Sequence, residues 1–191
     1  PVAAATWNGR GFSGGRWCGW SSPWSSILAP VELLDVLARR RSVRRFKPVP
    51  IPEEDLEKLL FALQRAPTDA SAQLYSAIRV RDPRLRDEVA RLSGDQEHIR
   101  QAAEFFLFLA DVHRLERLLA HRGQRMAFWP RTALHFAILD AGIAASYLAL
   151  TAEALGYGVC FIGGVLNGVE ALTDLLGLPP GVLPVVGLAV G

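Results

Sequence analysis

Hydrophobic residues recur at helical spacing in two stretches near the start of the regular part of the chain. In residues 31–40 (VELLDVLARR) the apolar positions repeat every three to four residues, and two arginines close the segment, where cations favour the negative end of a helix dipole. Residues 49–67 (VPIPEEDLEKLLFALQRAP) have Pro52 at the first turn, three acidic residues behind it and Pro67 after the end. Each pattern predicts an amphipathic helix.

Short apolar runs later in the chain are typical of strands. Residues 75–80 (YSAIRV) alternate between apolar and polar side chains, which predicts a half-buried strand. Residues 104–110 (EFFLFLA) are almost wholly apolar, as in a strand that is buried on both faces. Two further strands are expected at 159–162 (VCFI) and 183–191 (LPVVGLAVG), and a charged helix at 85–92.

The longest predicted element is a helix over residues 132–155, with Gly156 at its end. It is apolar almost all round, so it either spans a membrane or is covered by protein on every side. Asp140 and His135 argue against lipid, because an aspartate at the bilayer centre costs about 2.5–3.5 kcal/mol. We therefore expect the helix to form the spine of a core and of a dimer.

The remaining elements decide the fold class. Asn167 and Glu170 have the spacing of a capping box, which predicts a short helix that starts there. Helices outnumber strands, and both hairpin and crossover connections fit their order. The expected class is α+β, with a central mixed sheet flanked by helices.

Composition and charge narrow the function classes. The chain has 191 residues, 50% of them hydrophobic, which suits one globular domain. Its 21 basic and 19 acidic residues nearly cancel, so a surface that binds nucleic acid along its whole length is not expected. We expect no nucleic-acid partner and no membrane partner.

Residues 1–30 differ from the rest. They hold four of the five tryptophans, many serines and glycines, and no acidic residue, so we interpret them as an atypical appended segment before a domain at 31–191. Arginines and glycines interrupt every apolar window, and no export signal is expected. The two cysteines, Cys18 and Cys160, lie far apart without metal-ligand spacing, so the sequence predicts no metal and a reducing cytoplasm.

Six cations occur in the nine residues 39–47 (RRRSVRRFK). They could be a solvated helix end, or a basic element for nucleic acid, although no interleaved aromatic platform and no nucleic-acid motif accompany them. Alternatively, Arg40, Ser42 and Arg44 could converge on one phosphate, since guanidinium groups suit bidentate oxyanion contacts. No P-loop and no dinucleotide-binding glycine motif is present, so a phosphate here would be held by side chains.

Two other segments could complete a ligand site. Gln73, in the polar loop PTDASAQLYS, could offer its amide to a heterocycle, or could be an ordinary loop residue. Gly163 and Gly164 follow a predicted strand and permit close approach of a flat ligand, or simply form a tight turn.

Four segments in this order resemble the nitroreductase family of FMN-dependent flavoproteins, in particular its NADPH nitroreductases and NADPH:flavin oxidoreductases. RRSVRRF (40–46) is similar to the family's basic phosphate motif, and TDASAQLYSAIRV (68–80) to its serine-rich loop before a strand. The other two are LSGDQEHIRQAAEFFLFLAD (92–111) and the glycine-pair segment from 162 to 191.

The resemblance implies an intertwined homodimer that binds one FMN per active site at the subunit interface. It implies transfer of two electrons from NADPH or NADH to small-molecule acceptors, namely nitroaromatics, quinones or flavins, in a ping-pong cycle. The cofactor carries that chemistry, so no catalytic side chain is expected. The cofactor-binding residues that it implies are Arg40, Arg41, Ser42, Arg44, Gln73, Tyr75, Ile162, Gly163 and Gly164.

Other residues are expected to be structural. We interpret His98, His113, His121 and His135 as structural or surface residues, and Cys160 as a small buried hydrophobe.

The chain departs from the family pattern in two respects. Leu166 stands where the family usually has arginine after the glycine pair, and the C-terminal arm that normally adds contacts to FMN and NADPH is expected to be lacking. Three alternatives therefore stay open: another flavin chemistry within the family, a non-catalytic or degenerate flavin-binding module, and a basic binder of nucleic acid or membrane surfaces.

Overall fold

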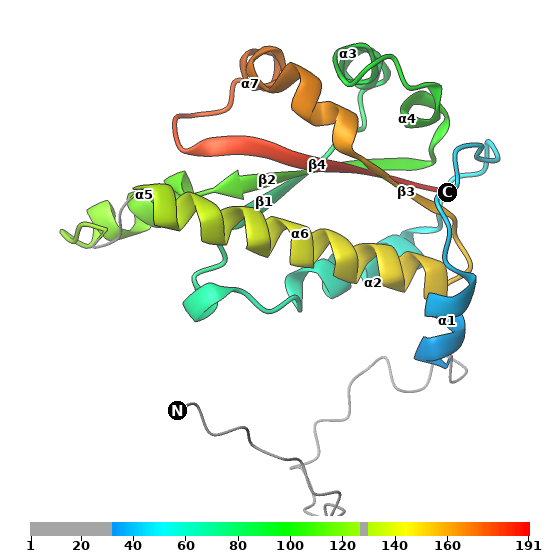
Figure 1. Ribbon diagram of the computed structural model, residues 1–191, viewed down its shortest axis with the longest axis horizontal. Coiled ribbons are helices and arrows are strands. Elements are labelled where there is room, and N and C mark those ends of the chain that lie inside the picture. The colour runs from blue at the N-terminus through cyan, green and yellow to red at the C-terminus, as the bar shows by residue number, and fades with distance from the viewer. Residues whose placement is uncertain (1–31, 127–129) are drawn as a thin grey trace, which may run out of the picture. The chain divides into compact units, whose positions relative to one another are not determined.

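The computed structural model describes residues 32–126 and 130–191. The predicted N-terminal segment, Cys18 and Val31 lie outside these residues. The described chain alternates helices and strands (Figure 1). Its elements are α1 (Leu33–Arg39), α2 (Glu53–Gln64), η1 (Asp69–Ser71), β1 (Tyr75–Arg79), α3 (Pro83–Leu92), α4 (Glu97–Gln101), β2 (Glu104–Asp111), α5 (His113–His121), α6 (Pro130–Ala154), β3 (Val159–Ile162), η2 (Gly163–Gly168), α7 (Val169–Leu176) and β4 (Val182–Val190).

The four strands form one sheet in the order β1-β2-β4-β3. A mixed sheet was expected, but every ladder between these strands is antiparallel. The strands β2 and β3 run in the same direction, yet β4 lies between them and runs against both. Among the described residues, the parallel pairing is the single bridge between Ser42 and Val159.

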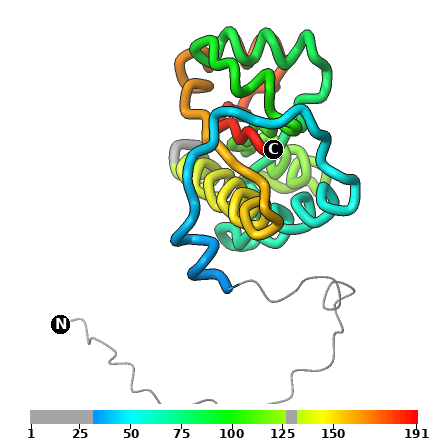
Figure 2. The backbone as a smooth tube through the Cα atoms, turned by 90° about the vertical axis from the view of Figure 1, so that its right-hand side faces the viewer, coloured from blue at the N-terminus to red at the C-terminus, as the bar shows by residue number. Residues whose placement is uncertain are grey.

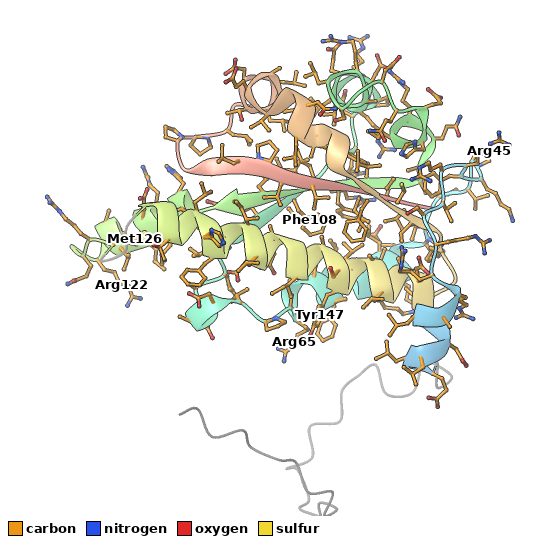
Figure 3. All side chains as sticks on the ribbon, in the orientation of Figure 1. Arg45, Arg65, Phe108, Arg122, Met126 and Tyr147 are labelled. Atoms are coloured by element: carbon orange, nitrogen blue, oxygen red, sulfur yellow. The ribbon has the colours of Figure 1, made fainter. Side chains whose placement is uncertain are left out.

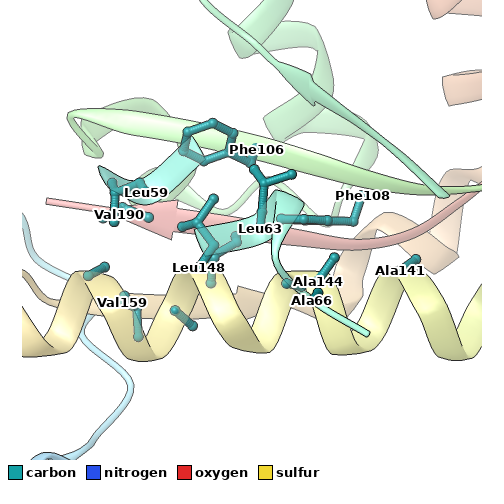
Figure 4. Packing of buried hydrophobic residues seen from close by; sticks show 14 of the residues in the cluster. Leu59, Leu63, Ala66, Phe106, Phe108, Ala141, Ala144, Leu148, Val159 and Val190 are labelled. Carbon is teal, nitrogen blue, oxygen red and sulfur yellow. The ribbon is translucent and has the colours of Figure 1, made fainter. Parts of the chain in front are cut away.

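Helices cover both faces of the sheet (Figure 1). All eight residues of β2 are buried, as its apolar run predicts. Phe106 and Phe108 point toward α2 and α6, where they pack with Leu59 and Leu148 (Figure 4). Phe105, from the alternate position of the strand, packs into the opposite layer with α3, α4 and α7. The sheet is therefore the centre of two cores, one on each face.

Helix α6 is the longest described element, and its stretch from 132 to 154 is long and apolar enough to cross a membrane, with a mean hydropathy of 1.6 over an 18-residue window. Its inner face packs on the sheet through Ala141, Ala144 and Leu148, which are fully buried (Figure 4). This packing confirms the prediction that the helix is a core spine. Its outer face leaves apolar side chains exposed, among them Leu139 and Tyr147, which points away from the sheet in Figure 3.

The start of α7 differs from the sequence prediction. The predicted capping box of Asn167 and Glu170 does not form, because Gly168 is the N-cap and no side chain caps the helix. Asn167 lies inside η2, which runs directly into α7. An N-cap residue needs a non-helical backbone to aim its side chain at the first turn, so Asn167 cannot take that role.

Candidate functional site

The basic segment after α1 is held along the edge strand β3. The helix ends at Arg39, and the extended chain beyond it forms the bridge between Ser42 and Val159, where the Val43 N–H donates to the Val159 carbonyl at 2.8 Å. Gly158 makes this docking possible, since a Cβ there would lie 2.8 Å from a methyl group of Val43. In Figure 2 the segment that follows α1 crosses beside β3 and the end of α6.

The cations of this segment project from both sides of the extended chain. Arg39, Arg41, Arg45 and Lys47 line an open pocket of about 840 Å³, and the Arg45 side chain projects outward from its loop (Figure 3). Arg44 is exposed and does not line this pocket, and its charge acts to lower the pKa of both His98 and Cys160.

These six cations have no carboxylate partner. Within residues 32–126 and 130–191 none of them forms an ion pair, whereas Arg79 is paired with Glu104 and Arg100 with three acidic side chains. The segments outside that range, 1–31 and 127–129, contain no aspartate or glutamate. Uncompensated guanidinium groups at one place fit an anionic ligand such as a phosphate.

One carboxyl group lies close to this charge. Glu153 of α6 lines the pocket and is buried, and burial raises the pKa of its carboxyl, against the opposing pull of Arg40, Arg39 and Arg41. Among the described residues its Oε1 has no hydrogen-bond partner. The pocket therefore combines a cationic rim with a buried carboxyl that is harder to ionise than usual.

The glycine pair packs against the loop between α3 and α4. A Cβ on Gly164 would lie 2.2 Å from the Ser93 carbonyl oxygen and 2.3 Å from Nε2 of Gln96, whereas Gly163 has open space around it. Ile162 is buried in the core, so its side chain belongs to the packing and only its backbone lies at the edge. The pair thus brings the end of β3 next to Gln96.

Sequence reasoning missed Gln96 and His98 as candidates. His98 is 9% exposed, and its Nε2 lacks a hydrogen-bond partner among the residues described. Burial lowers the pKa of its imidazole, and Arg44 lowers it further. Burial raises the pKa of the neighbouring Cys160 thiol, which is buried as predicted. Gln96 and His98 both lie in the segment 92–111 that resembles the family, but only the fold brings His98 near Arg44 and Gln96 against Gly164.

The remaining predicted residues lie elsewhere. Gln73 is exposed in the loop before β1. Tyr75 is buried, and its hydroxyl donates to the Leu63 carbonyl at 2.8 Å, so its side chain is part of the core beside α2. Burial raises the pKa of this hydroxyl.

Ser42 and the Gln73 loop are at opposite ends of the sheet, and the glycine pair lies between them, after Ile162, which pairs with Gly187 near the middle of β4. Val159, next to Ser42, pairs with Val190 at one end of β4, while Leu74 bonds to Asp111, which pairs with Val182 at the other end. The nine residues of β4 span ~27 Å, at about 3.4 Å per residue. Moreover, β1 and β3 are the two edges of the sheet. One chain therefore presents two separate groups of candidate residues, which we name the Arg44–Gly164 half-site, beside β3, and the Gln73 half-site, before β1.

Known proteins share this fold and much of this sequence. The model of the nitroreductase family matches residues 37–191. A curated relative, the FMN reductase (NADPH) of Bacillus subtilis, is 33% identical over 160 residues, which are 83% of this chain and 64% of that protein. The chain thus spans less than two thirds of that relative's length.

Solved structures of related enzymes superpose on this chain. A nitroreductase from B. subtilis superposes with a TM-score of 0.79 at 32% identity, covering 84% of this chain and 66% of that chain. The NADPH:FMN oxidoreductase from Vibrio harveyi superposes with a TM-score of 0.77 at 30% identity, covering 83% of this chain and 67% of that chain. The family match, the sequence identity and the shared fold agree with one another, and the chain belongs to the nitroreductase family.

Proposed function

We propose that this chain is an FMN-dependent oxidoreductase that transfers two electrons from NADPH or NADH to small-molecule acceptors such as nitroaromatics, quinones or flavins, by a ping-pong cycle. The observation that carries the proposal is the group of six cations at residues 39–47 without a carboxylate partner, docked on the strand that leads into the glycine pair. The relatives named as NADPH-dependent FMN reductases and oxidoreductases support it.

We assign the cofactor contacts to the two half-sites. In the Arg44–Gly164 half-site, Ser42 and Arg44 would hold the phosphate, Arg40 and Arg41 would add positive charge from the same segment, and Gly163 and Gly164 would admit the flat ring system. In the other half-site the Gln73 amide would meet the ligand. Bound FMN would supply the capacity to accept a hydride and pass on its electrons. The chain's own residues would therefore only bind and orient the cofactor and the substrates and shield them from water. The neutral imidazole of His98 fits beside the phosphate, because its unpartnered Nε2 could accept or donate a hydrogen bond there.

We further propose that the working molecule is a homodimer in the cytoplasm, with residues 31–191 as its functional domain. Gln73 and Ser42 are separated by the length of β4, farther than one FMN reaches, so a site that uses both needs a second chain. The exposed apolar side chains of α6 supply a surface for that partner. The free, buried Cys160 is consistent with a reducing compartment.

An absorbance spectrum of the purified protein with added FMN, recorded before and after anaerobic addition of NADPH, tests the proposal. We expect flavin bands that bleach on reduction. A protein that binds FMN but does not bleach with NADPH or NADH would be a flavin-binding module, and a protein that stays colourless would refute the cofactor assignment.

A matched pair of variants tests the phosphate contact. Arg44→Ala should weaken FMN binding by about 10- to 100-fold, because a hydrogen bond to a charged group is worth roughly 1.5–3 kcal/mol. Arg91→Ala, which removes an exposed α3 arginine paired only with Glu88, should leave the affinity unchanged. Fluorescence titration of FMN measures both, and equal affinities for the two variants would reject Arg44 as a ligand.

A further inference from the structure

The loop that carries Gln73 has an unusual backbone. Ala70, Ser71 and Gln73 have φ angles of 45°, 57° and 51°, in the left-handed region that favours glycine. None of the three is glycine, and such conformations persist where the surrounding structure imposes them. The loop therefore needs an external restraint to keep this shape.

Asp140 of α6, which lies 66 or more residues later in the chain, supplies that restraint. Its Oδ1 accepts the N–H of Asp69 at 2.9 Å and its Oδ2 accepts the N–H of Leu74 at 3.0 Å, so one carboxylate closes the two ends of the loop. Asp140 is 1% exposed, and within the described residues it forms no ion pair. A buried carboxylate without a cation is costly unless hydrogen bonds satisfy it, and these two do.

The backbone of Gln73 itself is fixed on both sides. Its N–H donates to Oγ1 of Thr68 at 3.2 Å, and its carbonyl accepts from the Arg114 guanidinium. The N–H of Arg114 in turn donates to Oδ1 of Asp111 at 2.9 Å. Because both backbone groups of Gln73 are occupied, its exposed side-chain amide is the part left to meet a ligand.

We propose that Asp140 is a positioning residue for the cofactor site: its carboxylate holds the loop 68–74 in the left-handed shape that presents the Gln73 amide. This inference rests on the proposed function. It requires a carboxylate and not merely a polar residue, since both oxygens must accept. An asparagine has nearly the same shape but would place an NH₂ donor against one of the two N–H groups.

The test compares Asp140→Asn with Gln73→Ala and a control, Asp174→Asn, which changes an exposed carboxylate on α7. Amide hydrogen exchange measures directly whether the Asp140 carboxylate protects the N–H groups of Asp69 and Leu74. We expect the Asp69 and Leu74 amides to exchange at least tenfold faster in Asp140→Asn, and no change at these positions in the control. Unchanged exchange would overturn the anchor.

FMN titration measures whether Asp140 affects cofactor affinity through Gln73. Asp140→Asn should raise the FMN Kd about tenfold, close to the effect of Gln73→Ala. The double variant should bind no more weakly than Gln73→Ala alone, because Asp140 acts through Gln73. A purely structural role would lower thermal stability and speed exchange while leaving the Kd unchanged, or would give additive losses in the double variant; either result would overturn the proposal.

A variant that fails to fold and a wild type that binds no FMN each have a distinct consequence. If Asp140→Asn does not fold, Arg114→Ala loosens the same loop from its exposed side and should raise the FMN Kd several-fold, again without adding to Gln73→Ala. If wild-type protein binds no FMN at all, the proposed function fails and the positioning role fails with it. The exchange rates at Asp69 and Leu74 then still decide whether Asp140 anchors the loop.

Discussion

The two glycines after β3 look alike in the sequence and differ sharply in their surroundings. A methyl group on Gly164 would overlap the Ser93 carbonyl oxygen, which backbone geometry fixes, whereas Gly163 has no atom within 4 Å of the same position. We expect Gly164→Ala to lower the free energy of unfolding by roughly 1–3 kcal/mol, the usual cost of overpacking.

Gly163→Ala is the matched control for that change. It should alter the free energy of unfolding by less than about 0.5 kcal/mol, as exposed substitutions do. Urea unfolding curves of both variants measure the difference. Equal stabilities would mean that the loop at Ser93 yields easily and that the contact does not constrain the end of β3.

His98 predicts a pH dependence of stability. Burial and Arg44 hold the pKa of its imidazole below the ordinary value of 6.5, so the unfolded chain binds the proton more tightly than the folded chain. The free energy of unfolding should therefore fall as the pH drops below 6.5, until it passes the lower pKa of the folded state. His98→Gln should remove this part of the acid sensitivity.

The exposed His121, at the end of α5, gives the control. His121→Gln should keep the pH profile of the wild type in urea unfolding between pH 5 and 7.5. If His98→Gln and wild type lose stability in parallel over that range, the acid sensitivity lies elsewhere in the protein.

At the scale of elements, the sequence predicted those whose packing imposes a clear pattern. The run at 104–110 is a strand buried on both faces, and the apolar stretch at 132–155 is the core helix α6. The helices α4 and α5 were not predicted. The first has only five residues, too few for a clear period. The second alternates apolar and charged residues at helical spacing (HRLERLLAH), so the sequence carried a signal that could have predicted it.

The candidate site was predictable in part, for a related reason. Residue type marked Arg44 as a possible phosphate ligand, and the fold leaves it without a carboxylate partner. His98, whose pKa the charge of Arg44 lowers, comes from a segment fifty residues away, and Gln96 of the same segment lies against Gly164. Only the folded chain reveals these contacts. Asp140 was visible only as a charge that argued against lipid. Its bonds to the Gln73 loop depend on the packing of α6, which no local pattern encodes.

At the scale of the whole molecule, the outer face of α6 predicts self-association. Leu139 is 53% exposed there, beside Ile143 and Tyr147. A charge buried in an interface without a partner costs about 3–5 kcal/mol, so Leu139→Glu should raise the dimer dissociation constant more than 100-fold. FMN affinity should fall with it if the site needs both chains.

Leu118→Glu provides a control of equal exposure, since Leu118 of α5 is also 53% exposed. It should leave both the dimer and FMN binding intact. Size-exclusion chromatography with light scattering, over a range of protein concentrations, measures the dissociation constants. A wild type that stays monomeric at every concentration would contradict the dimer. A Leu139→Glu variant that stays dimeric would show that the outer face of α6 is not the interface.

The place of β4 in the chain bears on how the protein is made. This strand pairs with β2, which begins nearly eighty residues earlier, and with β3, yet it follows every other described element. During synthesis from the N-terminus, β2 leaves the ribosome with its aromatic faces and has no β4 to pair with. The sheet can be completed only when the last described residues have emerged. While residues 112–181 are made, β2 can pair with β1 on one side but has no β4 on the other, so the nascent chain exposes an apolar strand edge that chaperones could cover.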